Sequence, residues 1–389
     1  MINKPINSIE SSDLDALVAN AVPEGKLLDY KRDLPGPADA DKKELLADAS
    51  SFANTAGGFL IFGVEETSGV PSAIVGIKVP DFDAELRRLD SILAAGIAPR
   101  MRYEMRRVTH SSGADLLLLH VDRSWNGPHR VIFKAHDRFY ARNSAGKYSL
   151  DVGELRDAFL SSSAIVDRVR DFHASRLIDI GAERVPTPLK DGARLVVHLL
   201  PISAFASAEQ LDISPMLSAP HTLPPMSAHG WNHRITLEGL LTFSQVNSSS
   251  NAYVHLYRNG IVEAVDAYML NQEVNGRRSI PSIAYEQRLI QGVGSYLGVQ
   301  KSIGAAPPLY IMTTLLGARG CWLATRDEFL DLSDRYPIDR DVLELPPIVL
   351  QEFGVDVASA LKPALDAVWH SCGFPASQNF DAAGKWKHG

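Results

Sequence analysis

Apolar positions between residues 44 and 64 predict a helix followed by a buried strand. Six apolar residues recur at helical spacing and form one face: Leu45, Leu46, Ala49, Phe52, Ala53 and Ala56. Gly57 and Gly58 can then end the helix in a left-handed conformation that other residues resist. The run FLIFGV at 59–64 is almost continuously apolar, which is typical of a strand covered on both faces. We expect Glu65 or Glu66 to project where this strand ends, because sites in α/β sheets usually form there.

The segment just upstream predicts another strand, EGKLLDYKRDL at 24–34. Side chains alternate between the two faces of a strand, so Asp29 and Lys31 point the same way. Glu24 lies immediately before this strand. The pattern therefore places acidic and basic groups on one face. A salt bridge of Lys31 with Asp29 or Glu66 at the strand edge is the simplest structural interpretation.

The remaining pattern predicts an α/β (α+β) chain in two domains. In the first half it predicts a helix at 81–96, a hairpin of strands 101–108 and 115–121, strands at 131–135 and 138–148, and helices at 151–160 and 161–181. In the second half it predicts strands at 192–202, 237–243 and 309–318, a hairpin at 252–270 turning at Asn259-Gly260, and helices at 283–299 and 354–372. We expect a mixed-sheet domain at 10–162, a helical linker at 163–184 and an α/β domain of unknown role at 185–389. His198 and His255 fall in apolar strands and are expected to be hydrogen-bonded core residues.

Length and composition fit a two-domain globular protein. The chain has 389 residues, of which 45% are hydrophobic and 22% charged. It has two cysteines and no Cys-x-x-Cys, which excludes a disulfide scaffold or zinc ribbon and fits a reducing cytoplasm. No apolar run reaches the length of a membrane span, and the N-terminus lacks the apolar region of a signal peptide. We therefore expect a cytoplasmic protein with no membrane association.

Charge is distributed unevenly along the chain. The formal net charge is −7, which argues against a globally basic nucleic-acid binder. Residues 1–99 carry 9 basic and 16 acidic side chains, whereas residues 100–147 carry 10 basic and 4 acidic ones. A local basic surface within an acidic chain can hold a polyanion. The alternative is that these cations lie on ordinary solvated strand faces.

Carboxylates and a lysine form the candidate chemical site: Glu24, Asp29, Glu66 and Lys31. Hydrolysis of a phosphodiester is assisted by a divalent ion that polarises the phosphoryl group and lowers the pKa of a water. Mg²⁺ and Mn²⁺ prefer oxygen ligands, which two or three carboxylates can supply. A nearby lysine neutralises charge that builds on the phosphate. The chain has no GxxxxGK[ST] phosphate loop, and Gly292, Gly294 and Gly298 lie in a helical pattern as packing glycines.

Several segments in the first 160 residues together resemble the Schlafen AlbA_2 domain, formerly labelled a divergent ATP-binding domain. They are Glu24-x4-Asp29-x-Lys31, SFANTAGG at 51–58, GFLIFGVEE at 58–66, IVGI at 74–77, Pro99-Arg100 and FYARNSAGK at 139–147. The resemblance covers about residues 10–160. The second half of the chain carries no interpretable motif.

The resemblance implies a nucleic-acid-binding α/β domain and, in some family members, a metal-dependent endoribonuclease that cuts tRNA or rRNA. The three carboxylates of such members match Glu24, Asp29 and Glu66. This chain departs from the family pattern at two of these positions, with Asp29 where Glu is usual and Glu66 where Asp is usual. Each exchange moves a carboxylate by one methylene, about 1.5 Å, and displacements of about 1 Å can impair catalysis.

The leading functional prediction is nucleic-acid binding, with RNA favoured over DNA. It includes Mg²⁺- or Mn²⁺-dependent endoribonuclease chemistry on tRNA or other structured RNA, with Glu24, Asp29 and Glu66 as metal ligands and Lys31 as the charge-neutralising partner. Phosphate contacts are predicted for Arg100, Arg102, Arg106, Arg107, Arg138, Arg142 and Lys147. Among these we favour Arg142, because its loop belongs to the family pattern.

Two alternative functions remain open. One is a non-catalytic DNA-binding transcriptional regulator, although no helix-turn-helix is recognisable. Another is an ATP-binding protein, which the missing phosphate loop disfavours. A homodimer is compatible with either function, and a role in bacterial defence rests on analogy alone.

Overall fold

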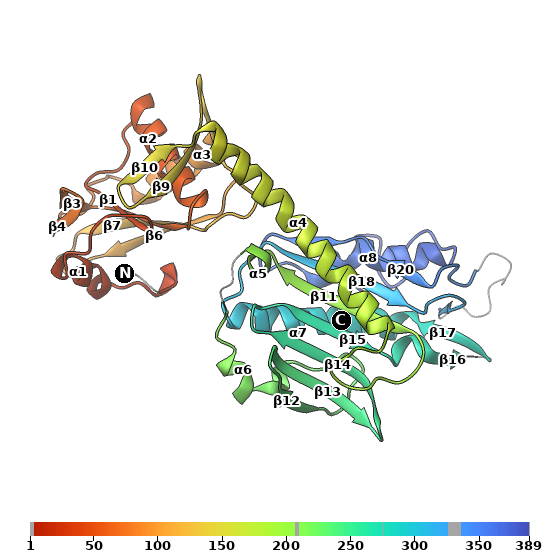
Figure 1. Ribbon diagram of the computed structural model, residues 1–389. Coiled ribbons are helices and arrows are strands. Elements are labelled where there is room, and N and C mark those ends of the chain that lie inside the picture. The colour runs from red at the N-terminus through yellow and green to blue at the C-terminus, as the bar shows by residue number, and fades with distance from the viewer. Residues whose placement is uncertain (1–3, 207–209, 275, 326–335, 389) are drawn as a thin grey trace. The chain divides into compact units, whose positions relative to one another are not determined.

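The computed structural model of the protein describes residues 4–206, 210–274, 276–325 and 336–388. The chain folds into two compact units, residues 1–164 and 165–389. Figure 1 shows helices packed on sheets in both units, so the predicted α+β class is confirmed. Helix α4 (Val152–Gly181) is a single helix of 30 residues, where the sequence predicted two adjoining helices. The division between the units therefore falls inside α4.

The N-terminal unit contains two four-stranded sheets, with strand orders β1-β2-β7-β6 and β10-β9-β8-β5. In the first sheet β1 and β2 are parallel and the other pairs are antiparallel, so the sheet is mixed as predicted. Its strands are β1 (Leu28–Lys31), β2 (Gly58–Phe62), β6 (Tyr103–Thr109) and β7 (Asp115–Val121). The second sheet comprises β5 (Ile97–Ala98), β8 (Arg130–Phe133), β9 (His136–Asn143) and β10 (Gly146–Ser149). The helices are α1 (Ser11–Ala19), α2 (Asp39–Ala53) and α3 (Phe82–Gly96), with a 3-10 turn at Ile6–Ser8.

The predicted helix, glycine stop and strand are confirmed, with α2 leading into β2. Gly57 has a φ of 72°, in the left-handed region. A Cβ on Gly58 would lie 2.4 Å from the carbonyl oxygen of Leu27, so only glycine lets the chain pass this close to β1. The parallel register then sets Asp29 beside Leu60 and Lys31 beside Phe62. Since Leu60 and Phe62 pack in the same core as α2, the polar pair Asp29 and Lys31 also faces that helix.

The strand predicted for residues 59–64 is interrupted at Gly63, whose φ of 97° turns the chain. The residues after it form a separate two-stranded hairpin of β3 (Val64–Thr67) and β4 (Val70–Ile74). Glu65 and Glu66 therefore belong to the hairpin and not to the end of β2. Glu66 therefore does not project from the end of β2, where the predicted carboxylate site required it.

The C-terminal unit is built on an eight-stranded antiparallel sheet of order β12-β13-β14-β15-β11-β18-β20, with β21 also paired to β18. Its strands are β11 (Arg194–Pro201), β12 (Asn232–Ile235), β13 (Gly239–Val246), β14 (Ser249–Tyr257), β15 (Val262–Asp266), β18 (Leu309–Leu316), β20 (Val342–Glu344) and β21 (Ile348–Leu350). A small sheet comprises β16 (Gln272–Val274), β17 (Arg277–Pro281) and β19 (Trp322–Ala324). The helices are α5 (Ser203–Ala206), α6 (Ser214–Ser218), α7 (Ser282–Ser302) and α8 (Val357–Ser371), with 3-10 turns at Pro220–Thr222 and Met269–Asn271.

Strand β11 lies in the middle of the large sheet and is buried at every position. Leu195, Val197 and Leu199 pack in the core formed with α7 and α8, and Val196 packs with the end of α4 on the opposite face. Figure 1 shows α4 crossing one face of this sheet. Strand β11 is therefore covered on both faces, which explains why it is almost continuously apolar. None of the helices in the described parts of the chain combines the length and apolarity that a membrane span requires.

A buried polar network joins α4 to the large sheet around Glu263 of β15. The Glu263 carboxylate accepts bonds from Arg176 at 2.7 and 3.0 Å, from His198 at 3.0 Å and from Tyr253 at 2.8 Å. Burial opposes ionisation of Glu263, but the bonds from His198 and Arg176 outweigh it and hold its pKa below the usual range. His198 is therefore a hydrogen-bonded core residue, as predicted, and so is His255, which contacts Thr236 at 2.9 Å.

Candidate functional site

Five charged residues from four elements of the N-terminal unit meet beside α2, and we call them the charged cluster: Asp29, Lys31, Asp48, Arg142 and Lys147. Asp29 contacts the Lys31 ammonium at 2.8 Å and the Arg142 guanidinium at 2.5 Å. Asp48 contacts Lys147 at 2.8 Å, Arg142 at 3.5 Å and Lys31 at 3.8 Å. Each carboxylate is thus shared among several cations, and Arg142 bridges the two carboxylates.

The local fold places these side chains together. Arg142 and Lys147 are directly opposite each other in the β9–β10 ladder, so both project from the same face toward α2. The end of α2 holds strand β9 in place, because Asn54 donates to the carbonyl oxygens of His129 and Tyr140 at 2.8 and 2.9 Å. The Thr55 hydroxyl also accepts a bond from the Arg142 amide at 2.9 Å. The Asn-Thr pair of the predicted family pattern therefore fixes the position of Arg142.

Burial separates the carboxylates of the cluster from its lysines. The Asp29 and Asp48 side chains are 7% and 2% exposed, whereas those of Lys31 and Lys147 are 33% and 21% exposed. Burial disfavours the charged form of Asp29, but Lys31 and Arg142 outweigh it and lower its pKa. Burial raises the pKa of Asp48, and Lys147 offsets only part of that effect. The carboxylates are therefore buried, while the side chains of the lysines that they contact are partly exposed.

Glu24 adjoins the cluster at the start of β1. Its carboxylate accepts a bond from the Tyr30 amide at 2.7 Å, and its own amide donates to the carbonyl oxygen of Gly69 at 2.7 Å. Burial raises the pKa of Glu24 to about 7, and the neighbouring charge of Asp29 adds to the effect. Glu24 is therefore a carboxyl group that titrates near neutral pH.

Titration of Glu24 is expected to make the folded N-terminal unit less stable as the pH rises. An unfolded glutamate releases its proton near pH 4.5, whereas folded Glu24 keeps it until about pH 7. The folded state thus binds more protons between these values, so the free energy of unfolding falls as the pH rises through this range. Because Glu24 is partly exposed, solvent screens the effect, and we expect a loss on the order of 1 kcal/mol.

Urea unfolding at a series of pH values from 4 to 8 (roughly the range that brackets both pKa values) measures this loss. Glu24→Gln should remove it, and Glu104→Gln, at an exposed position of β6, should retain it. An identical pH profile for the wild type and Glu24→Gln would show that another group is responsible.

The three predicted metal ligands do not form one coordination group. Glu66 accepts a bond from the Gly69 amide at 2.5 Å, within its own hairpin. Both oxygens of Asp29 contact cationic side chains, which occupy the positions where a divalent ion would bind. Among the described residues, no group of three His, Cys, Asp or Glu side chains is placed to hold a metal ion. The arrangement seen here therefore does not fit a divalent ion bound by Glu24, Asp29 and Glu66.

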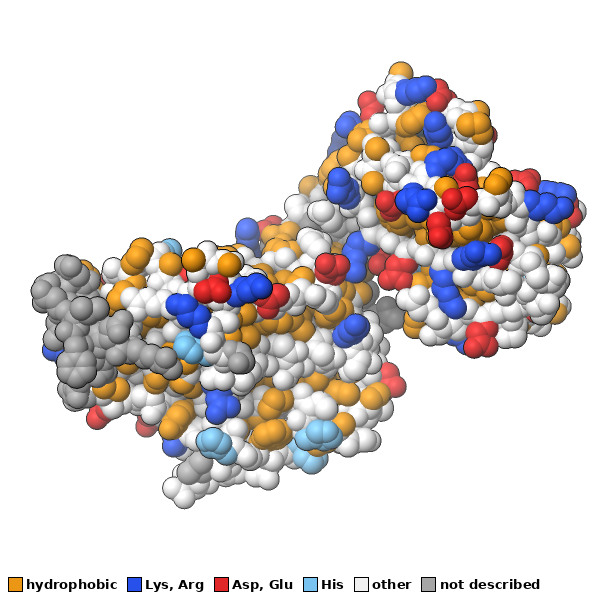
Figure 2. All heavy atoms as spheres, turned by 180° about the vertical axis from the view of Figure 1, so that it is seen from behind, with side chains coloured by type: hydrophobic (Ala, Val, Ile, Leu, Met, Phe, Trp, Pro, Cys, Tyr) orange, Lys and Arg blue, Asp and Glu red, His pale blue; other side chains and the backbone are white. Residues whose placement is uncertain are grey.

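The predicted phosphate-binding arginines do not share one surface. The Arg142 side chain is 2% exposed and pairs with the buried carboxylates of Asp29 and Asp48, so it faces inward in this structure. Arg107 pairs with Asp115 at 2.5 Å, Arg106 donates to the carbonyl oxygen of Ile6, and Arg102 lies 3.9 Å from Asp122. Exposed side chains remain at Arg100 and Arg138. Figure 2 shows basic and acidic side chains interspersed on the face of the N-terminal unit that it presents, without one continuous basic field.

Asp48 is the member of the cluster that sequence reasoning missed. It lies three residues after Leu45 and four before Phe52, both of which are buried in the core that α2 covers. An acid on the apolar stripe of a helix must be paired when it is buried. The sequence alone therefore indicated that Asp48 is buried and paired.

A cavity of about 280 Å³ opens beside Lys31 and Asp48, with Phe62 and Leu34 in its lining.

Comparison with known protein families connects this geometry to a domain type. Residues 24–151 match the family described as Schlafen, AlbA_2. The N-terminal unit contains a Schlafen AlbA_2 domain. The matched segment begins at Glu24 and includes every member of the charged cluster. The resemblance seen in the sequence is therefore confirmed for this part of the chain.

Two solved structures are similar to parts of the chain. One is the DIP2311 protein from Corynebacterium diphtheriae, at 20% identity and a TM-score of 0.27, covering 38% of this chain and 27% of that one. The other is the N-terminal domain of a protein named as related to the ATP-dependent DNA helicase RecG, from Nitrosomonas europaea, at 28% identity and a TM-score of 0.25. That match covers 33% of this chain and 82% of the other. No curated protein matches the chain.

Proposed function

We propose that the AlbA_2 domain binds the phosphate backbone of a nucleic acid, RNA in preference to DNA, through Lys31 and Lys147. One observation carries the proposal: the Lys31 and Lys147 side chains are 33% and 21% exposed, while the carboxylates that position them, Asp29 and Asp48, are buried. A phosphate that approaches from solvent meets the lysines first. Basic side chains held in fixed positions are the groups that fix a nucleic acid on a protein.

The contacts of Lys147 allow it to exchange a carboxylate for a phosphate when a nucleic acid binds. In addition to Asp48, Lys147 contacts Glu44, whose side chain is 58% exposed. Exposed ion pairs contribute little to stability, so a phosphate can replace Glu44 at small cost. The exposed Arg100, which follows the edge strand β5, and the exposed Arg138 of β9 can add contacts.

Structured RNA is favoured because the domain exposes few aromatic side chains on which bases could stack. Among the described residues, Tyr148 and Phe159 are the exposed aromatic side chains of the N-terminal unit, at 36% and 54% exposure. Sequence-specific recognition of single strands uses arrays of stacking aromatics, whereas structured RNA is recognised largely through its shape and backbone.

Fluorescence anisotropy with labelled tRNA and with duplex DNA, both in EDTA, tests the proposal. We expect tRNA to bind more tightly and the affinity to fall steeply with salt. Salt-sensitive binding that favours duplex DNA would support the DNA-binding regulator instead. Binding of neither nucleic acid would contradict the proposal.

A second candidate function is metal-dependent cleavage of the bound RNA. One observation favours it: Glu24 and Glu66 both bond to the backbone of Gly69, and the charge of Asp29 acts on Glu24. Glu24 and Glu66 thus lie near the turn at Gly69, and Asp29 lies near Glu24. Mg²⁺ or Mn²⁺ would bind there only if Lys31 moved away from Asp29, because both oxygens of Asp29 contact cationic side chains.

Incubation of tRNA with the protein in Mn²⁺ tests this second candidate. Cleavage that is abolished by EDTA, by Glu24→Ala and by Glu66→Ala, and retained by Glu65→Ala, would support it. Glu65 is a suitable control because it lies next to Glu66 in the hairpin and pairs instead with Arg32. Intact RNA in Mn²⁺ would rule it out.

A further inference from the structure

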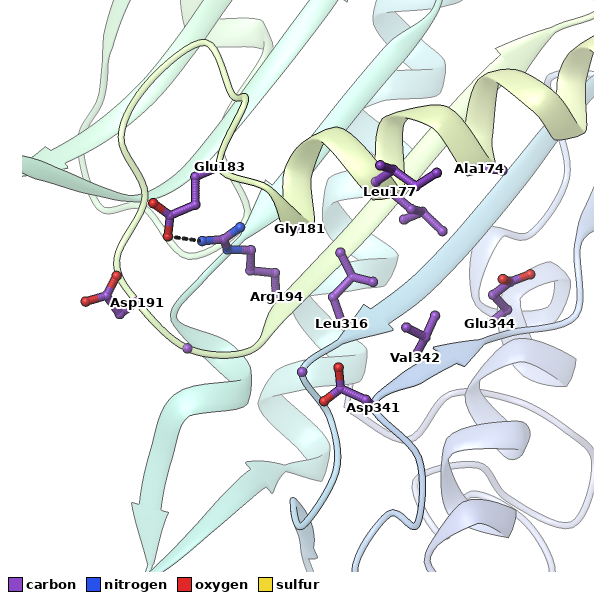
Figure 3. A pocket seen from close by; sticks show the side chains of 13 residues that line it. Ala174, Leu177, Gly181, Glu183, Asp191, Arg194, Leu316, Asp341, Val342 and Glu344 are labelled. Carbon is purple, nitrogen blue, oxygen red and sulfur yellow. Dashed lines mark hydrogen bonds and ion pairs between the residues drawn. The ribbon is translucent and has the colours of Figure 1, made fainter.

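A groove of about 700 Å³ lies in the C-terminal unit between the end of α4 and strands β18 and β20. Figure 3 shows that Leu177, Leu316 and Val342 approach one another across its floor. Acidic side chains from the turn after α4, from the start of β11 and from β20 lie around it. The groove therefore combines an apolar floor with an acidic rim.

Apolar side chains line both walls of the groove and are exposed to solvent. Ile178 of α4 is 66% exposed, and Val342 of β20 is 44% exposed. Single exposed apolar residues are common on protein surfaces, but two on facing walls of one groove form a surface that gains stability when it is covered. A ligand with apolar side chains would bury both residues at once.

The rim carries more negative charge than its one arginine can balance. Glu183 lies 3.4 Å from Arg194, which compensates it. Asp191, Asp341 and Glu344 also line the groove, and none of them forms a salt bridge with another described residue. Uncompensated carboxylates around a groove attract cationic groups and repel phosphates.

We propose that this groove binds a segment of a partner protein in which lysine or arginine alternates with apolar residues. The apolar side chains cover Ile178 and Val342, and the basic side chains pair with the carboxylates of the rim. A basic partner complements this rim better than a second copy of this chain, whose net charge is −7. The same rim excludes nucleic acid.

The test uses the full-length protein and three labelled soluble peptides of equal length, in fluorescence anisotropy. The first alternates lysine with valine, the second replaces lysine with glutamate, and the third replaces valine with serine. We expect the lysine–valine peptide to bind at least about tenfold more tightly than either of the others. Absence of binding, or equal binding of the lysine–serine peptide, would overturn the proposal.

Variants at exposed positions locate the binding without threatening the fold. We expect Ile178→Ser with Val342→Ser, and separately Asp341→Asn with Glu344→Gln, each to weaken the lysine–valine peptide about tenfold. Ile235→Ser with Leu237→Ser is the apolar control, since these residues are 60% and 88% exposed elsewhere in the same unit. Glu273→Gln, at an exposed position of β16, is the acidic control.

Equal effects of the control and groove variants would overturn the proposal. Sedimentation velocity provides a further check on the occupant. Dimerisation of the wild type that is lost in Ile178→Ser would show that a second copy, and not a basic partner, covers the groove.

Discussion

Replacing Arg142 with methionine is expected to lower the free energy of unfolding of the AlbA_2 domain by about 3–5 kcal/mol. The guanidinium joins Asp29 and Asp48, whose side chains are almost fully buried. Removing it takes one cation from each of two buried carboxylates, which keep only Lys31 and Lys147 as partners. Breaking a buried ion pair costs far more than losing a surface contact. Urea unfolding measures the loss, and hydrogen exchange of peptides from β1 and α2 assigns it to this domain.

Arg138→Met is the matched control, because Arg138 lies in the same strand with an exposed side chain. We expect it to change stability by less than about 0.5 kcal/mol. The double variant Asp29→Asn with Arg142→Met should recover part of the loss, since it removes one of the two buried carboxylates that lost Arg142 as a partner. Equal, small effects of Arg138→Met and Arg142→Met would show that the charged cluster does not stabilise the domain.

Replacing Glu263 with glutamine is expected to destabilise the C-terminal unit by about 3 kcal/mol or more. The carboxylate is fully buried and holds Arg176, His198 and Tyr253 together. A neutral amide of the same shape leaves the half-buried Arg176 with Asp179 as its remaining counter-ion and supplies N–H donors where the partners require an acceptor. The unfolding free energy, with hydrogen exchange in β11 and β15, measures the effect.

Glu238→Gln, at an exposed position beside β13, provides the control for Glu263→Gln. Arg176→Met is expected to lower the free energy of unfolding by a similar amount, because it removes the other partner of the same ion pair. The two changes combined should then cost less than the sum of the single changes. Strict additivity would mean that Arg176 and Glu263 do not stabilise the fold through each other.

Sequence patterns predicted the elements that depend on local chemistry. Gly57 and Gly58 ended α2 as expected, because a turn with positive φ and a close pass by Leu27 both require glycine. The turn at Asn259-Gly260 between β14 and β15 was predicted for the same reason, and Gly260 has a φ of 85°. The common face of Asp29 and Lys31 followed from strand alternation alone.

The candidate site was only partly predictable, because its contacts join segments far apart in the chain. The sequence indicated that Arg142 mattered, but only the β9–β10 ladder and the end of α2 show that it faces inward to Asp48. Glu66 matched a ligand position in the family pattern, yet Gly63 turns the chain and places Glu66 in a hairpin. The count of cations between residues 100 and 147 could not show that Arg107 is already paired with Asp115.

The central claim is that buried carboxylates hold Lys31 and Lys147 in place to bind phosphate. The most direct test is the salt dependence of tRNA binding in EDTA for the wild type, Lys31→Ala and Lys147→Ala, with Lys78→Ala at an exposed position as the control. We expect each cluster variant to bind more weakly and to reduce the slope of log K against log salt by about one, while the control retains the wild-type slope. Unchanged slopes in both cluster variants, or binding that requires Mn²⁺, would contradict the account.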